Sequence, residues 1–457
     1  MVNTLKKTYH KDDVFALLAT YFSACLIVMI TWLFSGTRSE YLFPMFAVSL
    51  ICYFCYWASK GGDSGLDKVL NYVLFLLIVV CVLQYVNPSA QHVVDEHYSY
   101  IRSLEHIAYL PTSVSGEYFR GNALSSLVSI ATALCSFIVF LYVFERTRHM
   151  NIILLWFIVN ALGMGIVGCI QEYLNIPIIY NVYYTTAIFF GSFPLSNAAG
   201  AFLNLAVSVS VYIALSKIKS KWGLLYVLFG TANAVLLSFA VFKTDSNIAI
   251  ASNFIFWMVI LFFCIIRLSM FLSKKTSKTF IIATWIFVCS VVVITFPSND
   301  EFCGLKAKAC EMAKNRSFEE SFRSRLTFYK LSYELINRRP IFGYGGDSCR
   351  YVLSLRLQKI RDKTVARLPH SIVHSHSDII EYVLEYGVVG LVAILAILTA
   401  WVFKFFKRKI NLPQIVLFTG IFMCILHSCI DMHLHIPSTM IELAMVMAVA
   451  VSSQYER

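Results

Sequence analysis

The chain has 457 residues, of which 58% are hydrophobic and only 14% are charged, and its formal net charge is +12. A soluble globular domain usually carries about 25% charged residues, so this composition excludes an ordinary water-soluble protein. A lipid bilayer is the expected solvent for most of the chain.

Long apolar runs predict the membrane-spanning helices. A span needs roughly 20 apolar residues, because backbone groups without hydrogen bonds are costly in hydrocarbon. The sequence therefore predicts an all-α polytopic membrane protein. About twelve such runs lie between polar breaks, with approximate cores at 14–34, 41–57, 69–86, 123–144, 152–173, 198–215, 222–242, 248–266, 279–296, 387–405, 414–430 and 437–452.

Basic residues indicate how the spans are oriented, because Lys and Arg in short loops prefer the cytoplasmic side of a membrane. With the N-terminus inside, the inner segments hold nineteen of the 38 basic residues and the short outer segments hold four. Both termini are therefore predicted to be cytoplasmic. The other fifteen lie in one large outer loop, 297–377, which separates spans 1–9 (1–296) from spans 10–12 (378–457).

The large outer loop holds fifteen basic and eight acidic residues, so it should attract anionic groups such as the headgroups of membrane lipids. A nucleic-acid partner is not expected, because no recognition module is visible. Cys303 and Cys310 lie seven residues apart. They either close a small disulfide ring in an oxidising compartment or stay free, and Cys349 is left over.

An amphipathic helix is predicted over 317–337 of this loop, opened by a capping-box pattern at Ser317. Arg325 falls inside its apolar stripe, whereas Arg323 and Lys330 fall on the polar side. A guanidinium that faces packed surface needs a partner, which is either a structural carboxylate or an anionic substrate. The stripe itself recurs at spacings of three and four and consists of Phe318, Phe322, Leu326, Tyr329, Tyr333 and Ile336.

A tight turn is predicted directly after this helix. Proline disfavours helix in the residue before it, here Arg339, and Gly343 and Gly345 permit positive φ on either side of Tyr344. A glycine-rich stretch without a Walker lysine is a weak signal of phosphate binding. Taken alone, the turn indicates only a connector.

Histidines and acidic residues gather where the tenth span begins, with His374, His376 and Asp378 at alternate positions. Histidine exchanges a proton near neutral pH, as a general base must. Alternate residues of an extended segment share a face, so a metal site is a second interpretation. A third interpretation is a plain helix start with Ser375 or Ser377 as the N-cap.

Two of these motifs resemble those of the O-antigen ligase and Wzy-type polymerase family of bacterial glycan-assembly enzymes. His376-Ser377, followed after nine residues by Gly387-x-x-Gly390, is similar to the family's His-Asn/Ser/Gln and Gly-x-x-Gly signature. Arg325 and the turn 339–345 resemble its arginine helix and the Pro-Leu-Phe-Gly-x-Gly turn that follows.

Two further stretches extend the resemblance, and one position departs from it. Residues 191–197 are similar to a Gly-x-Phe-x-x-x-Asn stretch before a middle span, and 427–431 resembles a late His-Ser-x-x-Asp element. Many members carry a Ser-Arg pair at the outer end of the seventh and eighth spans, whereas Ser246 is followed here by Asn247. Lys243 is the nearest cation, but a lysine lacks the bidentate fork that suits phosphate oxygens.

The resemblance implies a GT-C-like membrane fold with a partly helical periplasmic loop, located in a bacterial inner membrane with the active site facing the periplasm. It implies transfer of a glycan from a polyprenyl (undecaprenyl) diphosphate donor to lipid A core or another glycan acceptor. The reaction would be independent of metal and cofactor and would invert the anomeric centre. His376 is then the base, and Arg325 is the cation that stabilises the departing diphosphate.

The same resemblance gives further residues a role in binding the substrate or its diphosphate. These are Lys243, Arg323, Arg339, Tyr344, Asn197, His374 and Asp378, and the motif glycines are Gly343, Gly345, Gly387 and Gly390.

Two other functions stay open from the sequence. A Wzy-type polymerase would use the same donor to extend a growing chain. A transporter would use the loop as a lid and the histidines as a proton relay. Few ionisable residues lie near the centres of the spans and no inverted repeat is evident, which disfavours the transporter.

Overall fold

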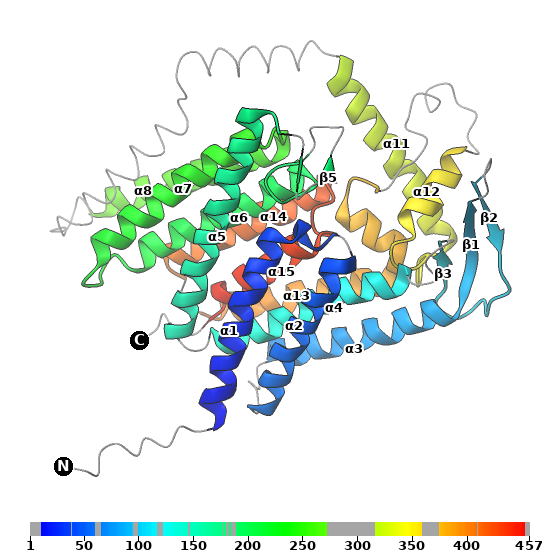
Figure 1. Ribbon diagram of the computed structural model, residues 1–457, viewed down its shortest axis with the longest axis horizontal. Coiled ribbons are helices and arrows are strands. Elements are labelled where there is room, and N and C mark those ends of the chain that lie inside the picture. Colours follow the sequence, from blue (N-terminus) through cyan, green and yellow to red (C-terminus); the bar gives the residue numbers. More distant parts are fainter. Residues whose placement is uncertain are drawn as a thin grey trace.

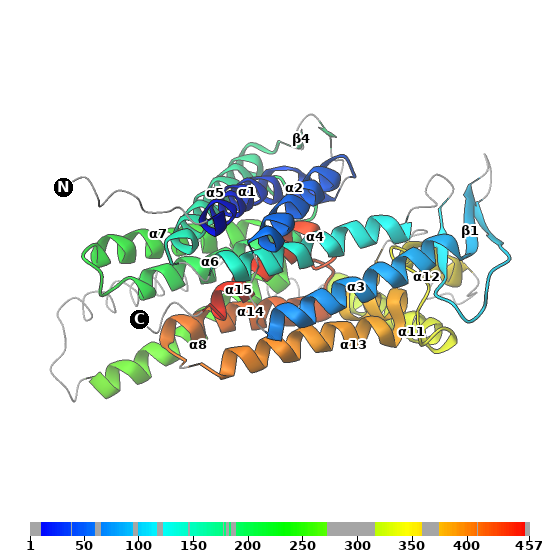
Figure 2. The same cartoon turned by 90° about the horizontal axis from the view of Figure 1, so that it is seen from below.

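The spans form one helical bundle (Figures 1 and 2). The computed structural model describes residues 11–37, 39–59, 65–94, 99–116, 122–144, 147–176, 178–179, 182–183, 189–271, 316–358, 374–408 and 410–452. The bundle helices are α1 (Lys11–Trp32), α2 (Ser39–Ala58), α3 (Gly65–Val86), α4 (Asn122–Val143), α5 (Thr147–Leu174), α6 (Ser196–Ser216), α7 (Gly223–Lys243), α8 (Asn247–Phe271), α13 (Asp378–Phe406), α14 (Leu412–Ile430) and α15 (Pro437–Ala450).

The number and composition of these helices confirm the predicted many-span membrane protein. Among the residues that the structure describes, ten helices are long and apolar enough to cross a membrane, namely all of the bundle helices except α15. The α15 helix coincides with the expected twelfth span but has only 14 residues. The expected ninth span, 279–296, lies outside the described residues.

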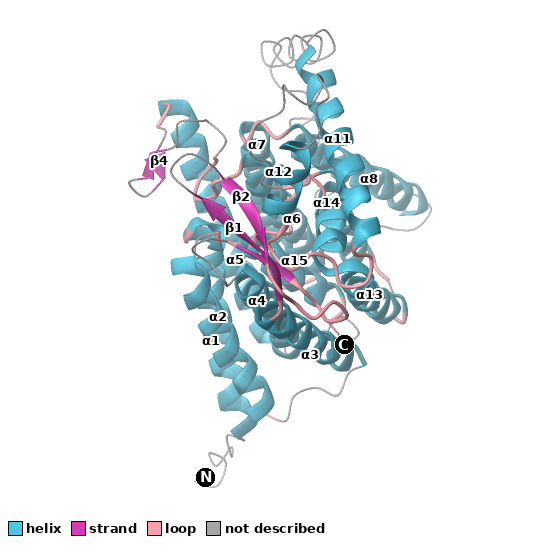
Figure 3. Ribbon diagram, turned by 90° about the vertical axis from the view of Figure 1, so that its right-hand side faces the viewer, coloured by secondary structure: helices cyan, strands magenta, loops and turns pink. Residues whose placement is uncertain are grey.

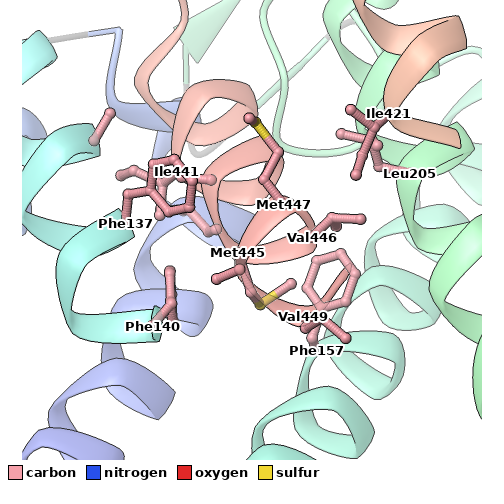
Figure 4. Close-up of a cluster of buried hydrophobic side chains, with 14 of the residues drawn as sticks. Phe137, Phe140, Phe157, Leu205, Ile421, Ile441, Met445, Val446, Met447 and Val449 are labelled. Carbon is pink, nitrogen blue, oxygen red and sulfur yellow. The ribbon is translucent and has the colours of Figure 1, made fainter. Parts of the chain in front are cut away.

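The core of the bundle surrounds α6 and α15. Among the described spans, α6 is the most enclosed, with 89% of its most apolar 18 residues buried. Figure 4 shows Met445 and Val449 of α15 packed among aromatic side chains, including Phe137 and Phe140 of α4 and Phe157 of α5. In a bilayer such packing acts through van der Waals contact, because lipid is as apolar as the core. It fixes the ends of α6, α14 and α15, where the candidate site lies.

A small β-sheet at one end of the bundle was not predicted. Its central strand β1 (Pro88–Val94) pairs antiparallel with β2 (Ser99–Ser103) and parallel with β3 (Ser113–Ser115). Figure 3, the view from this end, shows the sheet in front of the bundle. A separate short ladder joins β4 (Ile178–Ile179) and β5 (Val182–Tyr183).

The described part of the large loop folds onto this sheet. It contains α11 (Arg316–Arg338) and α12 (Cys349–Gln358), seen beside the sheet in Figure 1. Together with β3 and the start of α13 they enclose a second apolar cluster, separate from the bundle core. Its members are Val114, Phe328, Leu331, Leu335, Tyr344, Cys349, Val352, Leu353 and Leu384.

The predicted amphipathic helix is present as α11, and the predicted stripe matches its packed face in part, since Ile336 packs against this cluster and Tyr329 is half-buried. Leu326 and Tyr333 are 42% and 67% exposed, whereas residues on the opposite side are buried. Large apolar residues occur on both sides of α11, so periodicity alone did not decide which side packs. Arg325 is partly buried and lies one turn before the buried Phe328.

The helix α13, which coincides with the expected tenth span, is interrupted at Gly387, whose backbone (φ +63°, ψ −154°) is not helical. The turn 340–345 supplies the hydrogen bonds that the break removes. The N–H groups of Tyr344 and Gly345 donate to the carbonyls of Leu384 and Glu385, each at 2.9 Å. In return, the N–H groups of residues 388 and 389 donate to the carbonyls of residues 340 and 341, at 2.8 and 3.2 Å.

Glycine is required at this joint because two backbones meet there. A Cβ on Gly387 would lie 2.3 Å from the carbonyl oxygen of Ile341, and one on Gly343 would lie 2.5 Å from that of Glu385. Both glycines also have positive φ, which side chains strain to adopt. The two glycine motifs, far apart in sequence, therefore build one structural joint between the loop and α13.

Candidate active site

His376 lies in the short segment that joins the large loop to α13. Its φ of +58° is in the left-handed region, which is uncommon for a residue other than glycine. Two residues of α11 contact it. The ring of Phe328 stacks on the imidazole with centroids 6.0 Å apart, and the Tyr329 hydroxyl donates to the His376 carbonyl at 3.0 Å. Strained backbone of this kind clusters at active sites.

Asp431 is the carboxylate that faces His376. It follows α14, and its side chain is fully buried. Its Oδ1 lies 3.7 Å from Nδ1 of His376, slightly beyond hydrogen-bond range, and accepts from the N–H of Met432 at 2.9 Å. Its Oδ2 accepts from the side-chain amide of Asn197, at the start of α6. The segment before α13, the end of α14 and the start of α6 thus meet at the carboxylate of Asp431.

The surroundings of Asp431 favour its ionised form. Burial raises the pKa of its carboxyl, but the neighbouring His376 and His427 and the N–H of Met432 outweigh burial, so the pKa is below its usual value. A small pocket lined by Asn197, Asp431 and neighbouring residues opens beside the carboxylate. A carboxylate next to an imidazole orients the ring and stabilises its protonated form. The pair is therefore suited to act as a general base.

Arg325 brings a positive charge to the same place. It lies one turn before Phe328 and Tyr329, the two α11 residues that hold His376, and so shares their face of the helix. Its charge acts on Tyr329 and on His427 of α14, both close to the pair of His376 and Asp431. A guanidinium beside a base can bind an anionic group as that group leaves.

The other polar residues of the His374–Asp378 segment have partners different from that of His376. His374 Nδ1 lies 2.7 Å from Oε1 of Glu381, and Asp378 Oδ1 lies 2.6 Å from Nδ1 of His435. Within the described part of the chain, no group of three or more His, Cys, Asp or Glu side chains is arranged to hold a metal ion.

The start of α13 also agrees with one of the simpler predictions. Ser377 is the N-cap, and its hydroxyl accepts from the N–H of Ile380 at 3.5 Å. The N-cap interpretation is therefore confirmed for Ser377, and Ser375 instead bonds to Glu381. Capping and a catalytic role are compatible, since the cap residue directly follows His376.

Two more of the expected binding residues stabilise the loop. Arg339 donates through Nη1 to the Ser89 hydroxyl at 2.9 Å and to the Thr112 hydroxyl at 2.5 Å. Its guanidinium also lies over the ring of Tyr344, 4.9 Å from the centroid. These contacts join the glycine turn to the sheet.

Lys243 lies at the end of α7, where its Nζ is 3.5 Å from Oε1 of Glu172. It borders an apolar cavity of about 530 Å³ between α5 and α7. The side chain of Arg323, and Cys303 and Cys310, lie outside the described residues.

Three residues of the site were not among those predicted. Asp431 stands in the late His-Ser-x-x-Asp element, which carried the resemblance but no assigned role. Glu381 is an acidic residue near the start of a span, a position that itself signals function. The sequence around His435 contains no motif that would single it out. Its role depends on contacts with Asp378 and Glu381, which are more than fifty residues away in the chain.

The fold and the site define a many-span membrane protein with a histidine–carboxylate pair and an arginine where the large loop meets the bundle. Residues 232–395 match the family model described as O-Antigen ligase, which supports the resemblance seen in the sequence. The match includes Arg325, His376 and both glycine motifs but not Asn197 or Asp431. A comparison with curated proteins gave no match.

Proposed function

We propose that the chain is an O-antigen ligase-like glycosyltransferase that moves a glycan from a polyprenyl diphosphate to a sugar hydroxyl, such as one on lipid A core. The observation that carries this proposal is the pairing of strained His376 with buried Asp431, beside a cation from the large loop. The family match supports the class of reaction. The distribution of Lys and Arg supports an orientation in which this site faces the periplasm.

The proposed chemistry is a single displacement. With Nδ1 of His376 turned towards Asp431, Nε2 is the nitrogen that takes the proton from the acceptor hydroxyl. The acceptor oxygen forms a bond to the anomeric carbon as the bond from that carbon to the diphosphate oxygen breaks. Arg325 stabilises the charge that develops on the leaving diphosphate. Attack opposite the leaving group inverts the anomeric centre, and no metal or cofactor is required.

The other residues expected to bind substrate divide into two groups in this proposal. Asn197 and Asp378 hold the loop that carries Asp431, and Arg339 and Tyr344 hold the glycine turn. His374, Lys243 and Arg323 remain proposed contacts of the diphosphate or its lipid. Of these, His374 lies nearest to His376 in the chain.

Transfer by the purified protein in liposomes tests the assignment, with a polyprenyl diphosphate-linked glycan as donor. His376→Ala and Arg325→Ala should each abolish most transfer. Lys330→Ala, on the exposed side of α11, should not. Full transfer by both of the first two variants would refute the assigned site. Loss of transfer in EDTA would refute a metal-independent reaction.

A Wzy-type polymerase is the second candidate, because the same base and cation suit the extension of a growing chain. Deleting the gene and separating surface lipopolysaccharide on a gel distinguishes the two. Long chains that are not attached to lipid A core indicate a ligase. Single attached repeat units indicate a polymerase.

A further inference from the structure

A second buried carboxylate, Glu381, lies next to His376 without facing it. Its side chain is only 2% exposed, and it belongs to the first turn of α13. Its Oε2 accepts from the N–H of Ser375 at 2.9 Å and from the hydroxyl of that serine at 3.3 Å. Its Oε1 lies 2.7 Å from Nδ1 of His374. The carboxylate therefore binds both residues that precede His376.

These contacts help to hold His376 in its left-handed backbone conformation. A left-handed residue other than glycine persists only where its neighbours are held firmly. The carbonyl of His376 is held by Tyr329, and the chain before it is held by Glu381. Hydrogen bonds to an ionised carboxylate are stronger than those to a neutral acceptor. Glu381 is thus well suited to keep the segment 374–377 in this conformation.

The same turn of α13 also holds the loop that carries Asp431. The N–H of Asp378 donates to the Asp431 carbonyl at 3.3 Å, and Oδ2 of Asp378 accepts from the N–H of Leu434 at 2.9 Å. His435 connects the two carboxylates, with Nδ1 2.6 Å from Asp378 and Nε2 3.6 Å from Glu381. The first turn of α13 therefore holds both His376 and Asp431 in place.

We propose that Glu381, with Asp378 and His435, is a positioning residue that sets the imidazole of His376 against the carboxylate of Asp431. This inference rests on the proposed function, in which His376 is the base. Glu381 does not contact the reacting atoms in this assignment. It acts through the N–H and hydroxyl of Ser375 and through the imidazole of His374, so its loss should slow the chemical step much more than it changes binding of the lipid-linked donor.

Glu381→Gln tests the proposal against a matched control, Glu385→Gln. Glu385 lies one turn later on α13 and is equally buried, but its Oε1 accepts from the N–H of Cys349 and not from that of Ser375. Both variants are purified, reconstituted with a polyprenyl diphosphate-linked glycan, and measured for kcat, KM and thermal unfolding. We expect kcat of Glu381→Gln to fall about 10- to 100-fold, with a much smaller change in KM. Glu385→Gln should keep its kcat.

The outcomes separate the possibilities. An unchanged kcat in Glu381→Gln would overturn the positioning role. Equal losses of kcat in both variants, in step with their loss of thermal stability, would overturn it as well, because burial of a carboxylate in α13 would then be the shared cause. His376→Ala is measured in the same assay. If it transfers glycan normally, the proposed base is wrong whatever the result for Glu381.

Discussion

Replacing Asp431 with asparagine should lower both the stability of the protein and its kcat, and the two effects have different causes. Both oxygens of Asp431 are acceptors: Oδ2 takes the amide N–H of Asn197, and Oδ1 takes the N–H of Met432. In either orientation, the introduced amide would set its NH2 group against one of these donors. A buried donor without an acceptor costs about 1–3 kcal/mol. A misdirected base should lower kcat by roughly 100-fold or more.

A reciprocal double variant separates the two effects. Asn197→Asp combined with Asp431→Asn restores one donor and one acceptor across the contact, so thermal unfolding in detergent should return close to that of the unsubstituted protein. The charge, however, then lies at position 197. Because a neutral amide stabilises the His376 imidazolium poorly, kcat should remain low in a liposome transfer assay. Full activity in the double variant would show that the charge of Asp431 has no part in catalysis, and the proposed pair would be wrong.

Three further predictions follow from other contacts. Arg325→Lys should transfer faster than Arg325→Ala but slower than the unsubstituted protein in the same liposome assay, because lysine keeps the charge and loses the fork. Gly387→Ala should destabilise the protein by about 1–3 kcal/mol or more in thermal unfolding, whereas Gly65→Ala should not, since a Cβ at Gly65 meets nothing within 4 Å. Burial lowers the pKa of His435, but Glu381 and Asp378 outweigh it and raise the pKa to about 10. The resulting stabilisation is complete below the unfolded pKa of about 6.5 and is lost as the pH rises through about 10. His435→Gln should remove this pH-dependent loss of stability, which thermal unfolding measured at a series of pH values would detect.

The apolar spans and α11 could be predicted from the sequence because their signals are local. Hydropathy depends only on the residues of each span, and the N-cap at Ser377 depends on its own turn. The strands at 88–115 could not be predicted in this way. Their pairing includes a parallel contact between β1 and β3 and is supported by α11, α12 and the start of α13, which are distant in sequence.

The candidate site also combines residues that local signals predict with residues that only the fold brings together. His376 and Arg325 were predicted from spacing and from the resemblance, whereas their partners depend on chain segments that meet only in the fold. Asp431 is 55 positions beyond His376 in the sequence, and its other neighbour Asn197 is 234 positions from it. The packed face of α11 was assigned correctly only in part, because both of its sides carry large apolar residues. Only the position of the sheet and of α13 determines which side is covered.

The joint at Gly387 has a consequence for assembly and for protein engineering. Around Gly387, α13 exposes two carbonyls and two N–H groups until residues 340–345 bond to them, and such groups are unfavourable near hydrocarbon. The helix α13 therefore reaches its final form only when residues 340–345 have folded against it. In chimaeras with related proteins, the turn 340–345 and the segment 384–389 should be exchanged as one unit. A chimaera boundary placed between these two segments would separate backbone N–H and carbonyl groups that are hydrogen-bonded to each other.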